Sequence, residues 1–88
     1  MATIIKTTGE EIEIPKPNAR RINEIVGGWF DIARTHDGRA MFVHDEGLLL
    51  GLPVNEKATA LYRNGHVSPL VGDAVLLTAE ETREDEQA

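Results

Sequence analysis

The stretch WFDIARTHDGRAMFVHD, from Trp29 to Asp45, decides how this chain of 88 residues folds. Apolar and polar residues alternate on both sides of the pair Asp37-Gly38, and this period of two is typical of half-buried strands. An Asp-Gly pair favours a two-residue turn, because glycine adopts positive φ without steric cost. The stretch therefore predicts a β-hairpin. Its alternating apolar positions are Phe30, Ile32, Met41 and Val43.

The residues before this hairpin predict a second hairpin and a helix. TIIKTTGEEIEI (residues 3–14) reads as two short strands around a Thr-Gly turn, with isoleucines alternating against glutamates. Two prolines follow, and Asn18 is a suitable N-cap for a helix in ARRINEIV. The paired glycines Gly27 and Gly28 predict where this helix ends.

The residues after the hairpin are EGLLLGLPVNEKATALY, from Glu46 to Tyr62. Within them, LLLGL is short and continuously apolar, which predicts a buried strand ending at Pro53. Asn55 is a suitable N-cap for a second helix, whose Ala58, Leu61 and Tyr62 share one face. The segment VGDAVLLT then predicts a final strand after a Gly-Asp turn.

This order of elements predicts an α+β domain with a mostly antiparallel sheet and two short helices on one side of it. A partly closed, barrel-like sheet is the alternative. Residues 1–78 are expected to form a single compact domain. Residues 79–88 hold five acidic residues and little apolar content, so we expect an acidic, flexible C-terminal tail, either frayed helix or disordered.

Composition narrows the classes of function. Hydrophobic residues make up 41% of the chain and the net charge is −6, so we expect a folded domain that does not bind nucleic acid through its phosphates. Among functions linked to nucleic acid, the acidic composition favours only a mimic of DNA. No apolar run is long enough to span a bilayer and residues 1–6 have no signal-peptide pattern, which predicts a cytoplasmic protein without membrane contact.

The side chains that carry catalysis do not form a recognisable pattern in this sequence. His44 and Glu46 have the His-x-Glu order of zinc deaminases, but those enzymes also need a thiolate pair and this chain has no cysteine. His36 and His66 are not at the helical spacing that directs two imidazoles at one metal. We therefore expect neither an enzyme nor a metal or cofactor site.

The start of the second predicted helix is the best candidate for a binding site. Backbone amides at a helix start can bind an anion, and Lys57 would assist while Glu56 would oppose it. The alternative is purely structural: Asn55 caps the helix, Glu56 suits its dipole and Lys57 is solvated. Trp29, at a corner between helix and strand, could be an exposed anchor or a core residue. The candidate residues are Asn55, Glu56, Lys57, Thr59, Tyr62 and Trp29.

Three segments, INEIVGGWFDIAR, EGLLLGLPVNEKATALY and VGDAVLL, occur in an order that resembles a small domain-of-unknown-function family common in bacteriophages and mobile elements. The resemblance covers about residues 12–77. It implies a phage or plasmid origin and a compact accessory protein. It provides no activity and no catalytic residues that could be transferred to this chain.

The sequence thus supports three hypotheses. The first is a non-enzymatic binding module of phage type that engages a host protein and modulates its activity. The second is a binder of a small, nucleotide-like anion, and the third is an acidic DNA mimic. We also expect a homodimer, because a domain this small gains core by pairing.

Overall fold

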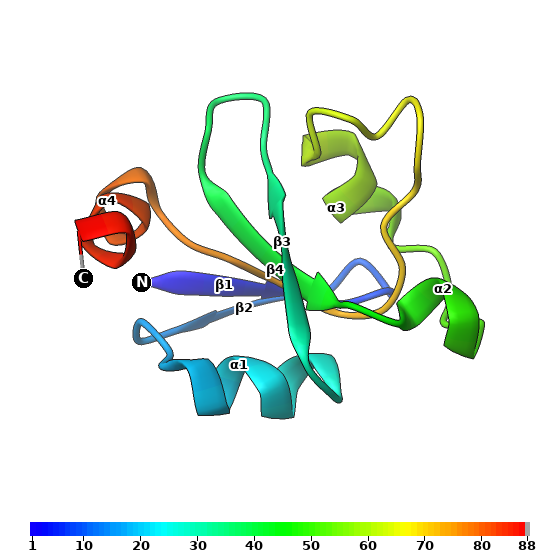
Figure 1. The fold of residues 1–88 in the computed structure, drawn as a ribbon, viewed down its shortest axis with the longest axis horizontal. Helices are drawn as coiled ribbons and strands as arrows, with labels where there is room; N and C mark the ends of the chain where they lie inside the picture. The colour runs from blue at the N-terminus through cyan, green and yellow to red at the C-terminus, as the bar shows by residue number, and fades with distance from the viewer. Residues whose placement is uncertain (88) are drawn as a thin grey trace.

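The computed structural model describes residues 1–87, which form an α+β domain built on one open antiparallel sheet, as predicted (Figure 1). The strand order is β2-β1-β5-β4-β3, so β2 and β3 are free edges and the sheet is not closed into a barrel. The strands are β1 (Ala2–Ile5), β2 (Glu11–Ile14), β3 (Phe30–Arg34), β4 (Ala40–His44) and β5 (Ala74–Leu76). The helices are α1 (Ala19–Val26), α2 (Gly47–Leu50), α3 (Glu56–Leu61) and α4 (Ala79–Gln87).

Helices cover both faces of the sheet, so the expectation of helices on one side was wrong. α1 packs on the face that carries Phe42 and Val75, and α3 packs on the face that carries Met41 and Ala74. In Figure 1, α1 lies below the sheet and α3 above it. The central strands β4 and β5 are buried at almost every position. Such strands need a cover on each face, because neighbouring residues point to opposite sides.

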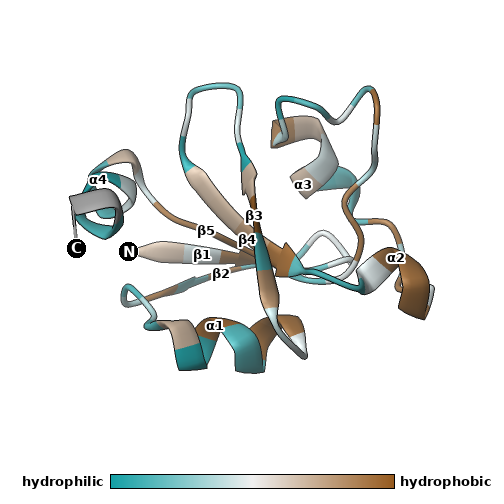
Figure 2. Ribbon diagram, in the orientation of Figure 1, coloured by the Kyte–Doolittle hydropathy of each residue, from teal (hydrophilic) through white to brown (hydrophobic). Residues whose placement is uncertain are grey.

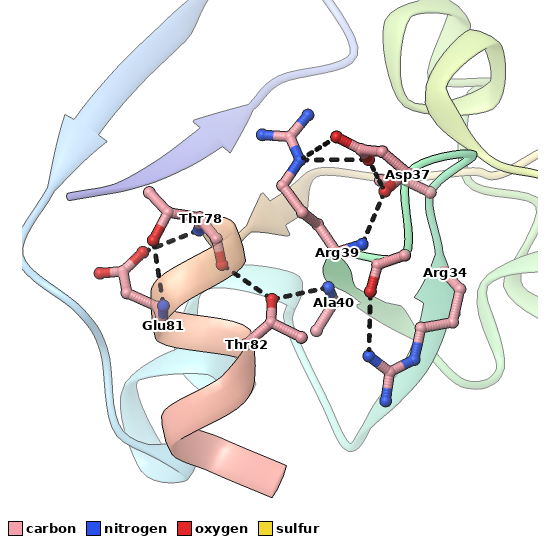
Figure 3. Close-up of polar contacts among 9 residues, drawn as sticks. Arg34, Asp37, Arg39, Ala40, Thr78, Glu81 and Thr82 are labelled. Carbon is pink, nitrogen blue, oxygen red and sulfur yellow. Dashed lines mark hydrogen bonds and ion pairs between the residues drawn. The ribbon is translucent and has the colours of Figure 1, made fainter.

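The hairpin predicted around Asp37-Gly38 is confirmed, with β3 and β4 paired from Phe30↔His44 to Arg34↔Ala40. Its turn is not the expected two-residue type. The Gly38 N–H donates to the Thr35 carbonyl, so His36 and Asp37 are the central residues of the turn and Gly38 follows them with φ 85°. The Thr35 hydroxyl donates a hydrogen bond to Asp37, which lowers the pKa of this carboxyl, and Arg39 pairs with it as well (Figure 3).

The buried strand predicted for LLLGL was wrong, because this segment is the short helix α2. Both neighbours of β4 in the sheet are already present, namely β3 and β5, so no interior place remains for another strand. Gly47 is buried against Val71, where a Cβ atom would lie 2.7 Å from a side-chain methyl. The chain therefore turns tightly at this point, and its leucines do not enter the core.

The acidic segment after Thr78 is a helix whose first turn contacts the body of the domain (Figure 3). Thr78 and Glu81 form a capping box: each backbone N–H donates to the other residue's side chain, at 2.9 and 3.1 Å. The Thr82 hydroxyl accepts from the buried Ala40 N–H at 3.0 Å. The sequence Thr-Ala-Glu-Glu carries this capping signal, which the sequence analysis missed.

An ion pair adds a second contact between α4 and the body. The Lys16 ammonium lies 2.8 Å from Asp85, and this hydrogen bond raises the pKa of Lys16. Both side chains are partly exposed, so the pair contributes little to stability. Within residues 1–87, no helix has the length and apolar character needed to cross a membrane.

Candidate functional site

Asn55 is the first of the predicted site residues. Its side chain forms hydrogen bonds within the domain itself. Its side chain is 1% exposed and caps α3 by accepting from the Ala58 N–H, as predicted. Its amide group also donates to the carbonyls of Ile5 and Gly72, at 2.8 and 2.9 Å. The two amide contacts join the start of α3 to β1 and to the loop before β5, so the Asn55 side chain is engaged within the domain.

The neighbouring residues of α3 are also engaged within the domain. The Thr59 hydroxyl donates to the Asn55 carbonyl and accepts from the Leu70 N–H. The Lys57 ammonium lies 2.6 Å from the Gly9 carbonyl and 2.9 Å from Glu11, so it ties α3 to the turn between β1 and β2. Glu56 is exposed in the first turn of the helix. The structural alternative thus holds for the Asn55 cap and for Glu56, whereas Lys57 is paired within the domain rather than solvated.

Trp29, in contrast, projects from the surface with 74% of its area exposed. Just before Trp29, the chain passes close to β4 at Gly28. A Cβ atom at Gly28 would lie 2.5 Å from the His44 imidazole, so glycine permits this close approach. The Trp29 carbonyl accepts from the Asp45 N–H at 3.0 Å, which places the tryptophan backbone beside the residues that lead into α2. Of the two positions considered for this residue, the exposed one is observed.

The largest departure from the sequence analysis is the exposure of the α2 leucines. Leu48, Leu49 and Leu50 are 65%, 84% and 60% exposed. Figure 2 shows α2 as a strongly hydrophobic helix at the edge of the molecule, away from the sheet. Exposed leucines are common singly, whereas three consecutive ones form a patch of the kind that marks an interaction site.

A hollow of about 170 Å³ lies between α2 and the edge strand β3. Leu48 forms part of its wall from one side, and Asp31 and Ala33 of β3 from the other. Tyr62 also lines it, so the structure brings this predicted site residue to the hollow rather than to the start of α3. We call Leu48, Leu49 and Leu50, together with the hollow beside Leu48, the leucine surface.

Acidic residues surround the leucine surface. Asp31 and Asp45 line the hollow, and Glu46 directly precedes α2. All three are exposed. The sequence from residue 40 to residue 56, which includes Asp45 and Glu46, contains no lysine or arginine.

A second groove, of about 310 Å³, lies on the α1 face of the sheet. Its floor includes Ile22 and Phe42, which are only 3% and 4% exposed, and Thr82 of α4 forms part of its wall. Its floor therefore belongs to the core under α1, and Ile32, which is paired with Phe42, is exposed in its wall. The leucine surface exposes far more apolar side chain.

The histidines do not form a site with other ligands. Within residues 1–87, no three His, Asp or Glu side chains gather where they could hold a metal ion. His44 is 8% exposed in its side chain, and its Nδ1 accepts from the Glu46 N–H at 3.0 Å. This contact helps to hold the turn between β4 and α2.

Comparison with known proteins extends the resemblance seen in the sequence to the whole chain. Residues 1–88 match a family described as a domain of unknown function, DUF3846. The chain belongs to this family. No curated protein and no solved structure matches the DUF3846 chain.

Proposed function

We propose that this DUF3846 domain is a non-enzymatic binding module that engages a partner protein through the leucine surface. One observation carries the proposal: three consecutive leucines on α2 are 60% or more exposed. Burying a leucine side chain contributes roughly 1.5–3 kcal/mol, so a partner that covers these three would gain a favourable contribution from each. Trp29, 74% exposed beside the entry to α2, is a residue type enriched at interfaces.

We further propose that the chain is of phage or mobile-element origin and acts in the cytoplasm on a host protein, whose activity it modulates. Support for the origin comes from the sequence resemblance alone. The anion-binding alternative has little support from the geometry, because Asn55, Lys57 and Thr59 are all engaged in contacts within the domain. A mimic of DNA is also less favoured, since Glu81 is buried and Asp85 is paired with Lys16.

The proposal is tested by affinity capture from a bacterial lysate with the parent chain and with Leu49→Ser. Leu49 is 84% exposed, so the substitution should leave folding intact, which a thermal melt verifies. We expect the variant to lose the specifically captured protein. Ala79→Ser, at an exposed position of α4, is the matched control and should retain it. Equal capture by the parent chain and Leu49→Ser would refute the proposed function.

A further inference from the structure

The leucine surface also indicates what kind of partner segment it fits. The first clue is the free edge of β3. A partner strand could extend the sheet there only by hydrogen bonding to unpaired backbone N–H and C=O groups. The N–H groups of Phe30 and Ile32 already donate to the side chains of Asn23 and Asp31, at 3.0 and 2.8 Å. The Arg34 carbonyl accepts from the Arg63 N–H at 3.0 Å. A partner is therefore poorly placed to bind by extending the sheet.

The second clue is the size of the hollow. At about 170 Å³, it is smaller than the roughly 300–1,000 Å³ of typical small-molecule pockets. It lies between Leu48 and the β3 residues Asp31 and Ala33, with Leu49 and Leu50 exposed on α2. A partner that inserts one apolar side chain and lays others along α2 would cover this surface. Apolar side chains three or four residues apart lie on one face of a helix and could cover the surface in this way.

The third clue is the acidic rim, which consists of Asp31, Asp45 and Glu46. The rim favours basic residues in the partner, because complementary charge steers association and like charge opposes it. It disfavours an anionic membrane surface. It also disfavours a second copy of this chain docked on the same surface, since that would bring two acidic rims together.

We propose that the leucine surface binds a basic amphipathic helix of the partner protein. Apolar residues on one face of that helix would rest on Leu48, Leu49 and Leu50 and enter the hollow beside Leu48. Lysine or arginine residues flanking this face would meet Asp31, Asp45 and Glu46. The inference rests on the proposed function and specifies the chemistry of its partner.

The test uses three fluorescent peptides of about 16 residues, a length at which isolated helices become appreciable. Two have the same leucine face at helical spacing and carry either lysine or glutamate at the positions that flank this face. The third has the composition of the lysine peptide with its residues alternating, as in a strand. Binding is measured by anisotropy, and vesicles with anionic lipid are tested separately by sedimentation.

We expect the helical lysine peptide to bind at least about tenfold more tightly than either other peptide, a difference of roughly 1.4 kcal/mol. Leu49→Ser should weaken its binding, and the vesicles should not bind the protein. Neutralising the rim with Asp31→Asn, Asp45→Asn and Glu46→Gln should remove most of the preference for lysine over glutamate.

A matched control separates the rim from the net charge. Glu10→Gln, Glu13→Gln and Glu80→Gln remove the same charge from exposed positions with no ion pair among the described residues, and this triple variant should keep the preference. Equal loss in both triple variants would show non-specific attraction and overturn the inference. Tighter binding of the strand peptide, the glutamate peptide or the vesicles would overturn it as well.

The inference and the proposed function can fail separately. If no peptide binds while capture from the lysate still depends on Leu49, the partner does not present a basic helix and only the inference is wrong. If capture does not depend on Leu49, the proposed function fails first.

Discussion

Replacement of Asn55 by alanine should destabilise the domain far more than the loss of an ordinary helix cap. The cap itself, from Asn55 Oδ1 to the Ala58 N–H, is worth about 1 kcal/mol. The side chain also donates two buried hydrogen bonds, to Ile5 and Gly72, each worth about 1 kcal/mol net. We therefore expect Asn55→Ala to lower the free energy of unfolding by about 3 kcal/mol.

The chain contains its own control for this experiment. Asn18 caps α1 in the same way, by accepting from the Arg21 N–H at 2.9 Å, but it is exposed and its side chain makes no second hydrogen bond to the sheet. Asn18→Ala should cost about 1 kcal/mol. Asn55→Ser, which keeps a hydroxyl for the cap but cannot supply the two amide donors, should fall between the two.

Urea denaturation followed by circular dichroism measures all three variants. With a denaturant slope of roughly 1 kcal/mol per molar urea for a domain of this size, the midpoint should move by about 3 M for Asn55→Ala and about 1 M for Asn18→Ala. If Asn55→Ala is unfolded without urea, Asn55→Ser provides the measurable comparison. Equal costs at Asn55 and Asn18 would refute the reasoning that the amide donors hold α3 to the sheet.

Four further outcomes are expected. Removal of α4 should lower the melting temperature by more than about 5 °C, equivalent to roughly 1 kcal/mol, because it leaves the buried Ala40 N–H without its Thr82 partner; an unchanged melting temperature would show that α4 does not pack. Lys57→Ala should cost up to about 1 kcal/mol in urea denaturation, since the Lys57 ammonium contacts Gly9 and Glu11; an unchanged midpoint would show that these exposed contacts contribute nothing. Because the pKa of Asp37 is lowered in the folded protein, its carboxylate stabilises the fold at pH values above its ordinary pKa, and this contribution is lost as pH falls through the folded pKa. Asp37→Asn should therefore make the free energy of unfolding fall less steeply with decreasing pH, and an unchanged pH profile would contradict this. The homodimer expected from the sequence should, if it forms through the α2 leucines, be stronger at about 500 mM than at 50 mM salt in sedimentation, because salt screens the acidic rims; a dimer favoured by low salt would point to another surface.

Local signals in the sequence were sufficient for the elements whose ends depend on nearby residues. The caps at Asn18 and Asn55 and the left-handed Gly27 are formed as predicted, because each involves atoms no more than a few residues apart. The hairpin around Gly38 and the α+β class follow from alternation of apolar residues in the same way. The capping box of Thr78 and Glu81 was equally local and could have been predicted.

Other features depend on partners distant in the sequence, and only the tertiary structure decided them. A continuous apolar run such as Leu48 to Leu50 is typical of a buried strand, but whether it is buried depends on whether the sheet has a place for it. That place is taken, since β4 already pairs with β3 and β5, so the leucines remain at the surface as the candidate site. Likewise, α4 docks through Thr82 on Ala40, 42 residues earlier in the chain, a contact that no local pattern specifies.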